Sequence, residues 1–148
     1  MKIYLAGPLF TTAEQDWLRR LKAQILAGNP AAPVEVCSPH ELFTSQEIAG
    51  WGDRAKQEIF HRCRNHLDSA DMVVAVLDGT QVDDGTAWEI GYFFAHRKIG
   101  LPIIGIRTDF RKAGDRPNAL VNLMIDCSCD SIVTAVDDLL REIARHLR

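Results

Sequence analysis

The run Met72–Leu77, MVVAVL, is the stretch that most constrains the fold of this chain. It is continuously apolar and rich in β-branched residues, without the alternation expected of a strand that has one side in solvent. A strand of this kind is typical of the centre of a parallel sheet, because helices cover both faces of such a sheet. We therefore expect helices on each side of a parallel sheet.

Strand and helix patterns alternate along the rest of the sequence. Further short apolar segments, expected to be strands, lie at Lys2–Ala6, Val34–Cys37 and Leu101–Ile106. Apolar residues recur at helical spacing in three sets, namely Trp17, Leu18, Leu21, Ile25 and Leu26; Ala55, Ile59, Phe60, Cys63 and Leu67; and Val136, Leu139, Leu140, Ile143 and Leu147. This alternation predicts right-handed crossovers. The expected fold class is α/β, a single-domain doubly wound parallel sheet of about five strands in the flavodoxin-like order 2-1-3-4-5.

The length and composition are those of one ordinary globular domain, spanning residues 1–148. Hydrophobic residues make up 47% and charged residues 25% of the chain. The formal net charge of −3 offers no basic surface to nucleic acid or to an anionic membrane. No apolar run approaches the roughly 20 residues of a membrane span, and the N-terminal apolar stretch is too short for a signal peptide. We expect a cytoplasmic protein with no nucleic-acid or membrane partner.

The sequence indicates neither a metal site nor a nucleotide cofactor. Its four cysteines are Cys37, Cys63, Cys127 and Cys129, and only the last two are close together. Structural metal sites use paired ligands at tighter spacing, so we interpret these residues as buried free thiols. Neither GxGxxG nor GxxxxGK[ST] occurs, so we expect no nucleotide cofactor despite the expected fold. No cofactor and no metal are predicted.

The expected strand order places a crevice between the first and third strands, beyond their carboxyl ends. The loops Gly7–Phe10 and Asp78–Gly85 would border it. The helix that follows is uncharged between Asp84 and His96 except for Glu89, which is surrounded by aromatic and aliphatic residues. A single carboxylate in such a helix is therefore a candidate functional group.

Two interpretations of Glu89 are open. Thr86-x-x-Glu89 has the spacing of a capping box, and a carboxylate in the first turn favours the helix dipole. Capping does not explain why Asp78, Asp83 and Asp84 crowd the preceding loop. A helix that is apolar nearly all round is buried by its own domain or by a partner chain. A carboxylate there should have a perturbed pKa, which is typical of a functional site.

Transfer at the anomeric carbon of a sugar is a chemistry that uses such a set of acids. One carboxylate attacks C1, expels the leaving group and holds the sugar covalently. A second acid can orient the ring through its hydroxyl groups, and a further group protonates the leaving atom.

Four segments resemble the nucleoside 2-deoxyribosyltransferase family. They are KIYLAGP at the N-terminus, ADMVVAVLDG, DDGTAWEIGY, and NLM at 122–124. Of these segments, DDGTAWEIGY is the most specific. The match runs in order from Lys2 to about Ile125. The resemblance implies exchange of a 2-deoxyribosyl group between nucleobases, without a cofactor and with retention at C1. The substrates would be 2-deoxynucleosides and free nucleobases, in nucleotide salvage.

The resemblance also implies catalytic roles for three residues. Glu89 would be the nucleophile that carries the sugar, and Tyr4 would hold its carboxylate. Asp83 would bind a sugar hydroxyl group. From the sequence pattern alone, Tyr4 could equally be an ordinary aromatic residue of a strand.

Further residues are implied to bind the substrate. Asn122 matches a family residue that reaches the sugar of a neighbouring subunit, so the resemblance implies a homo-oligomer with shared sites. Gly7 and Phe10 would line the base pocket, and Met124 would lie beside the substrate. From spacing alone, Asn122 could instead cap a short helix.

Cys63 departs from the family pattern. Many members have Asp or Asn at a substrate-binding position on the helix before the third strand. In this chain that position, eight residues ahead of Asp71, is Cys63. A thiol is a poor acid at neutral pH. His40, Glu41 or a water molecule could protonate the departing base instead, and the sequence leaves these alternatives open.

Two other functions compete with transfer. A nucleoside or nucleotide N-glycosidase would pass the covalent sugar to water, but in the turn GPLFTT a proline removes one donor for a phosphate, which favours an unphosphorylated nucleoside. A nucleotide-binding module would have no use for Glu89 as an attacking group. The charged stretch Arg107–Arg116 fits either a solvated loop or a mobile lid.

Overall fold

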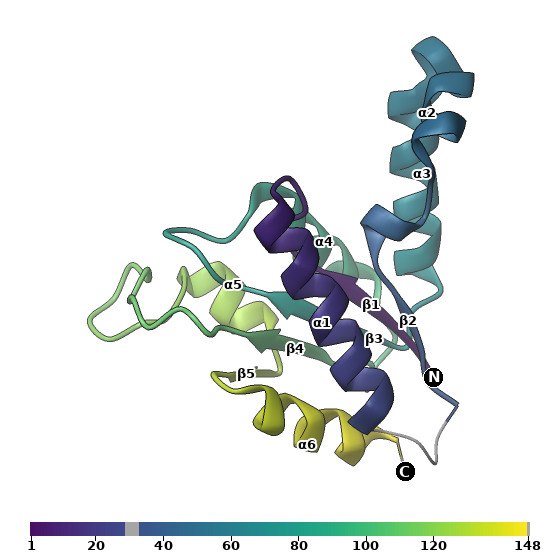
Figure 1. Cartoon of the computed structure of the whole chain (residues 1–148). Helices are drawn as coiled ribbons and strands as arrows, with labels where there is room; N and C mark the ends of the chain where they lie inside the picture. Colours follow the sequence, from purple (N-terminus) through teal and green to yellow (C-terminus); the bar gives the residue numbers. More distant parts are fainter. Residues whose placement is uncertain (29–32, 148) are drawn as a thin grey trace.

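A five-stranded parallel sheet forms the centre of the computed structural model, which describes residues 1–28 and 33–147 (Figure 1). Its strands have the order β2-β1-β3-β4-β5, so the predicted doubly wound order is confirmed. The strands are β1 (Lys2–Ala6), β2 (Glu35–Cys37), β3 (Met72–Val76), β4 (Ile103–Ile106) and β5 (Ser131–Val133), and each pairs in parallel with its neighbour.

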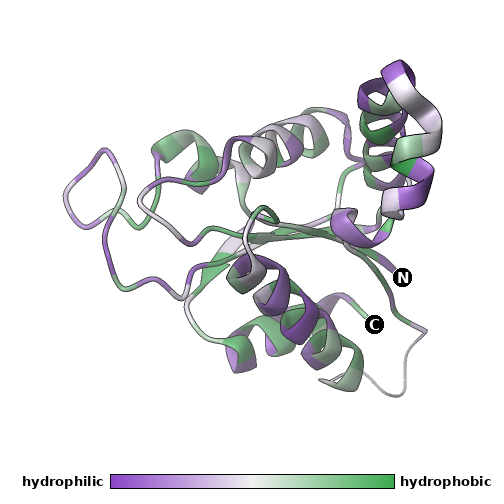
Figure 2. Ribbon diagram, turned by 45° about the horizontal axis from the view of Figure 1, so that its top comes forward, coloured by the Kyte–Doolittle hydropathy of each residue, from purple (hydrophilic) through white to green (hydrophobic). Residues whose placement is uncertain are grey.

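Helices cover both faces of this sheet. Helices α1 (Thr12–Gly28) and α6 (Val136–His146) pack on one face, and α3 (Ala55–Asp68), α4 (Asp84–His96) and α5 (Leu123–Ser128) lie on the other (Figure 1). Figure 2 shows the strands coloured as hydrophobic between helices whose outer sides are more hydrophilic.

Strand β3 explains why the sequence of its segment is apolar throughout. All five residues of the strand are buried. Met72, Val74 and Val76 pack towards α1 and α6, while Val73 and Ala75 pack towards α3 and α4. Successive side chains point to opposite faces, so a strand covered on both sides needs an apolar residue at every position.

Two elements were not anticipated individually. Strand β5 is only three residues long, and helix α2 (Ser45–Trp51) lies in a stretch for which no helix was predicted. The N-terminus of α2 is a capping box: the amide of Glu47 donates to Thr44 Oγ1 at 3.2 Å, and Glu47 accepts from the amide of Thr44 at 2.8 Å. The helix has no buried residue, so hydrophobic spacing alone did not reveal it.

Helix α2 and the start of α3 extend away from the sheet as an arm (Figure 1). Of the residues in α3, only Leu67, near its C-terminal end, is buried. The arm therefore exposes much of its surface in a single chain. Among residues 1–28 and 33–147, no helix is long and apolar enough to cross a membrane.

The four cysteines are free thiols, as expected. Burial is the leading cause of raised thiol pKa values in three of them, to about 12 at Cys37, about 11 at Cys63 and about 12 at Cys129. Cys127 is exposed and the other three thiols are only partly buried, so the expectation of buried thiols was wrong at Cys127 and holds only in part at Cys37, Cys63 and Cys129. It lies on the short helix α5, which has no buried residue.

Candidate active site

Helix α4 begins at the carboxyl end of β3, and Asp83 is its N-cap. Asp83 Oδ2 accepts hydrogen bonds from the amide of Thr86 at 2.9 Å and from Thr86 Oγ1 at 3.0 Å. Thr86 is therefore a helical residue in the first turn and not the cap. The capping-box interpretation of Thr86 and Glu89 was wrong, because Asp83 already satisfies the free amide at this end of the helix.

Glu89 meets Tyr4 of the neighbouring strand β1. Tyr4 is fully buried, and its hydroxyl group donates a hydrogen bond of 2.5 Å to Glu89 Oε1. Burial raises the pKa of Glu89 to about 7, although the hydrogen bond from Tyr4 opposes the rise and nearby Asp83 adds to it. Burial and the adjacent Glu89 also raise the pKa of Tyr4, so this phenol remains a donor. The expected perturbed carboxylate on this helix is confirmed.

A cleft of about 410 Å³ opens between α3 and α4 at this pair of residues. Its other lining residues are Gly85 and Trp88 from α4, and Lys56, Ile59, Phe60, Cys63, Arg64 and Leu67 from one face of α3. Among these, Glu89 is the only carboxylate. The helical spacing of Ile59, Phe60, Cys63 and Leu67 predicted a face of α3, but not that this face is one wall of the cleft.

Cys63 lies in this cleft with Tyr4 and Glu89. Burial and the adjacent Glu89 carboxylate raise the pKa of the Cys63 thiol to about 11. The thiol therefore stays protonated at neutral pH and does not act there as an acid of useful strength.

The structure places the two alternative acids elsewhere. Glu41 Oε2 pairs with Lys22 Nζ of α1 at 2.5 Å. His40 Nδ1 lies 3.1 Å from Ser38 Oγ, and burial lowers the pKa of His40. Neither His40 nor Glu41 lines the cleft of Glu89.

Gly7 and Phe10 belong to the loop after β1. A Cβ atom on Gly7 would lie 2.8 Å from Leu18 Cδ2 and 3.2 Å from Val76 Cβ, so close packing against α1 and β3 favours glycine here. Phe10 is 75% exposed. Within one chain neither residue lines the cleft of Glu89, and their role in binding the base remains a prediction.

Asn122 is the N-cap of α5, which is the helix-capping role that its spacing in the sequence allowed. Its Oδ1 accepts from the amide of Met124 at 2.9 Å, and its Nδ2 donates to Asp115 Oδ2 at 3.2 Å. Asn122 lines a separate hollow with Val82 and Ala87, and Met124 is 69% exposed. Within one chain, neither Asn122 nor Met124 lines the cleft of Glu89.

Asp78 and Arg107 have structural roles that the sequence analysis missed. Asp78 accepts from the amide of Thr108 at 2.6 Å, from Thr108 Oγ1 at 2.7 Å and from the amide of Asp109 at 2.8 Å. Arg107 is 1% exposed and donates to the carbonyl oxygens of Leu77 and Gly79, the latter at 2.9 Å. Asp78 therefore joins the ends of β3 and β4 and is no part of the cleft.

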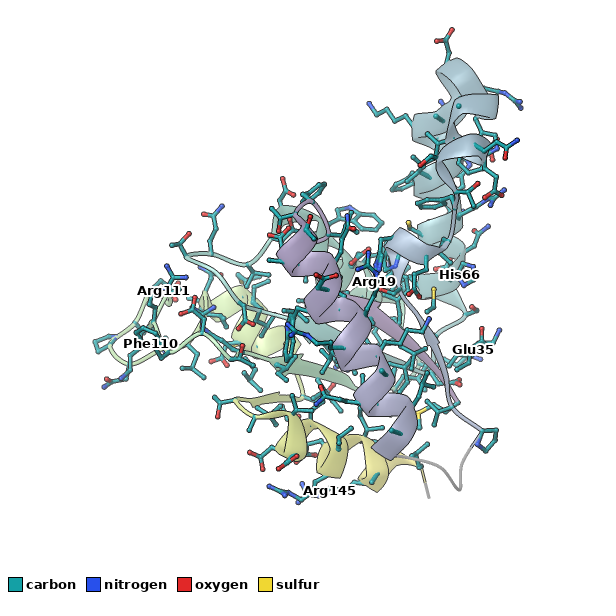
Figure 3. All side chains as sticks on the ribbon, viewed as in Figure 1. Arg19, Glu35, His66, Phe110, Arg111 and Arg145 are labelled. Carbon is teal, nitrogen blue, oxygen red and sulfur yellow. The ribbon has the colours of Figure 1, made fainter. Side chains whose placement is uncertain are left out.

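The interpretation of the charged stretch after β4 as a solvated loop was wrong for Arg107. Farther along the loop, Phe110 and Arg111 lie at the outer edge of the molecule, as Figure 3 shows, and both are exposed. An arginine directly after a buried strand was the one signal that could have indicated a buried guanidinium. Within the described ranges, no group of three or more His, Cys, Asp or Glu residues could hold a metal ion.

Comparison with known proteins identifies the family of this chain. The profile of the nucleoside 2-deoxyribosyltransferase family matches residues 3–124. An uncharacterised protein of Ureaplasma parvum serovar 3 is 31% identical in an alignment 159 residues long, which covers 100% of this chain and 97% of that protein.

Three solved structures are similar over nearly the whole chain. A conserved protein from Enterococcus faecalis V583 has a TM-score of 0.81 and 27% identity, covering 99% of each chain. The 2-deoxyribosyltransferase of Bacillus psychrosaccharolyticus has a TM-score of 0.74 and 23% identity, covering 95% of this chain and 90% of its own. The 2-deoxyribosyltransferase of Leishmania mexicana has a TM-score of 0.68 and 20% identity, covering 98% of this chain and 97% of its own. At these identities the last two structures show the shared fold alone.

Proposed function

Since the chain belongs to the nucleoside 2-deoxyribosyltransferase family, we propose that it moves a 2-deoxyribosyl group from the nucleobase of a 2-deoxynucleoside to a second, free nucleobase. One observation supports this proposal above the others. A partly buried carboxylate, Glu89, accepts a hydrogen bond from a buried phenol, Tyr4, in an open cleft. An isolated, partly desolvated carboxylate is a suitable nucleophile for a sugar carbon.

The proposed reaction consists of two displacements at C1. Tyr4 holds Oε1 of Glu89, and Oε2 attacks C1 while the bond from C1 to the base nitrogen breaks and its electron pair leaves with the base. A nitrogen of the incoming base then attacks C1, and the bond to Glu89 breaks. Two displacements restore the original configuration, so the product retains the stereochemistry of the substrate.

Asp83 is proposed to orient the sugar. Its Oδ2 holds the start of α4, and the carboxylate is close enough to Glu89 to raise the pKa of that residue. The remaining oxygen, Oδ1, would accept a hydrogen bond from the 3-hydroxyl group. A ribose 2-hydroxyl would crowd or hydrogen-bond the attacking Glu89, which favours deoxynucleosides.

The remaining proposed residues belong to the base pocket and to a neighbouring chain. Gly7 and Phe10 would approach the base from the loop after β1. Asn122 would reach the sugar of a neighbouring subunit, consistent with its place outside the cleft of its own chain, and Met124 would lie beside the substrate. The proposed unit is thus a homo-oligomer, acting in nucleotide salvage in the cytoplasm.

Trapping the covalent sugar tests the proposed function. The protein is mixed with a 2-deoxynucleoside and no acceptor base, and intact mass and peptide mapping should place one deoxyribosyl group on Glu89. Glu89→Ala should show neither the adduct nor transfer to a second base, with an unchanged circular dichroism spectrum. A product inverted at C1, or an active Glu89→Ala variant, would exclude the nucleophile role. Release of sugar to water despite an added base would identify a hydrolase.

A further inference from the structure

Three aromatic rings form a column along helix α4, and one end of this column lies in the cleft of Glu89. The rings of Trp88 and Tyr92 are stacked, with centroids 5.0 Å apart and planes 15° apart. The rings of Tyr92 and His96 are also stacked, with centroids 4.4 Å apart. The three residues are spaced four apart, so they share one face of the helix. Of the three, Trp88 alone lines the cleft.

The side of the Trp88 ring away from Tyr92 is open. Long side chains of a helix lean towards its N-terminus, so this ring lies over the turn that contains Gly85. Gly85 lines the same cleft and has no side chain to cover the ring. Among the described residues, a Cβ atom on Gly85 would meet only Asp83 Oδ2, at 3.2 Å. A flat ring can therefore approach Trp88 from this side.

Phe60 of α3 supplies a second aromatic wall. Its ring centroid lies 5.5 Å from that of Trp88, with the planes 61° apart, and each of the two side chains is 46% exposed. Both rings are close to the reacting group. Trp88 directly precedes Glu89, and Phe60 is one helical turn, about 4.5 Å along the axis, from Cys63. The Glu89 carboxylate in turn is near enough to raise the pKa of the Cys63 thiol.

The polar groups beside Glu89 offer a base few hydrogen bonds. The hydroxyl group of Tyr4 already donates to Glu89, and the thiol of Cys63 is a weak donor. Every nucleobase, by contrast, has a flat π-face that can stack on an aromatic side chain. Ring surface is therefore the feature by which this part of the cleft can best hold a base.

We propose that the open side of Trp88 binds the nucleobase by stacking, with the ring of Phe60 at its edge, so that the base extends the aromatic column of α4. This inference rests on the proposed function, because it takes Glu89 as the group that attacks C1. The departing base and the incoming base occupy this place in turn. Recognition by ring area favours purines, which have the larger rings, and discriminates weakly among the polar groups that a base carries.

Binding of free bases to Trp88→Leu tests this proposal. The variant should bind free adenine about tenfold more weakly than the wild type in equilibrium dialysis, because a stacking surface is lost. Its KM for 2-deoxyadenosine should rise to a similar extent, with little change in kcat. The loss should be smaller for cytosine and 2-deoxycytidine. Trp88→Phe retains a ring and should recover most of the binding.

Phe94→Leu is the matched control. Phe94 is on the same helix and is 48% exposed, but it does not line the cleft, so this variant should bind adenine as the wild type does. Equal losses in Trp88→Leu and Phe94→Leu would overturn the proposal. A smaller assembly of Trp88→Leu in light scattering would do the same, because Trp88 would then serve a contact between chains. A loss for cytosine as large as that for adenine would exclude recognition by ring area. A wild type that moves no sugar between bases would refute transfer, while dialysis with adenine would still decide the role of Trp88.

Discussion

The carboxyl group of Glu89 shows how one residue can oppose the stability of the element that carries it. Its pKa is about 7 in the folded protein, against an ordinary value of 4.5, because the side chain is buried. The folded state thus binds the proton more tightly than the unfolded state does. Stability should therefore fall as pH rises from about 4.5 through 7, by roughly 3 kcal/mol in total.

Glu89→Gln should consequently stabilise the fold at high pH, because it retains an oxygen for Tyr4 but cannot ionise. Urea unfolding at pH 8 should give a larger free energy of unfolding for the variant, by roughly 1–3 kcal/mol. At pH 4.5 the two proteins should be nearly equal. A variant that is less stable at both pH values would show that the carboxylate itself holds the structure together.

Tyr4 should set the pH dependence of base release. Its hydrogen bond favours the ionised form of Glu89, so Tyr4→Phe should raise the pKa of Glu89 above about 7. The rising limb of kcat/KM, measured from pH 5 to 9, should move to higher pH. Tyr92→Phe is the control, since its hydroxyl group donates to Asp68 at 2.7 Å on the surface. An unmoved limb in Tyr4→Phe would mean that Glu89 is not the titrating group.

Asp83 and Asp84 are adjacent acids with different environments. Asp83→Asn keeps a good N-cap for α4, because Asn caps helices about as well as Asp, but it removes the charge offered to the sugar. Loss of a charged hydrogen bond worth roughly 1.5–3 kcal/mol predicts a tenfold to hundredfold lower kcat/KM. Asp84→Asn, at an exposed position, should change little. The reverse result would mean that Asp84 binds the sugar.

Among the elements, the loops after β3 and β4 act as one unit. Arg107 donates to the carbonyl oxygens of Leu77 and Gly79, and Asp78 accepts from the amides of Thr108 and Asp109. These contacts fix the chain as it leaves the sheet and approaches the N-cap of α4. The position of Glu89 in the cleft thus depends on a network outside it.

Arg107→Lys should weaken this network, because an ammonium group cannot bind several carbonyl oxygens in the geometry of a guanidinium. We expect the free energy of unfolding to fall by about 2 kcal/mol or more, measured in urea. Arg111→Lys is the matched control. The Arg111 side chain pairs with Asp109 but is largely exposed, so this variant should be close to the wild type. Equal effects of the two substitutions would contradict the assigned role of Arg107.

At the scale of the whole molecule, helix α4 leaves two large aromatic side chains about half exposed in a single chain. Helix α4 buries Thr86, Ile90 and Phe93, whereas Trp88 is 46% and Phe94 48% exposed. Gly91 lies between these two aromatic residues on the exposed side, and a Cβ atom there would meet nothing within 4 Å. This surface is suited to a second copy of the chain, so the predicted minimum is a dimer.

Gly91→Lys tests this surface without disturbing the monomer. Lysine fits the open space and favours a helix interior more than glycine does, so the fold should not be weakened. Light scattering should show a smaller assembly, and base exchange should fall with it. Ala23→Lys, at an exposed position of α1 on the other face of the sheet, should leave both unchanged. A fully active wild-type monomer at assay concentration would refute the oligomer.

Local patterns were sufficient for a parallel sheet covered on both faces and for the isolation of Glu89. Burial on both faces leaves a continuous apolar run, as at β3, and a single carboxylate in an apolar helix is visible in any reading of residues 84–96. Both features depend on spacing along a single element. That is why the parallel sheet and the perturbed acid were predictable from the sequence.

The tertiary structure alone decided which partner each polar group takes. Thr86 and Asp83 both had the chemistry of a cap, and the path of the chain out of β3 determined that Asp83 caps α4. Asp78 meets Thr108 only because β3 and β4 are neighbours, although the two residues are 30 positions apart. Lys56 joins Glu89 in one cleft because α3 packs beside α4. Such contacts depend on the relative placement of elements, which local spacing does not encode.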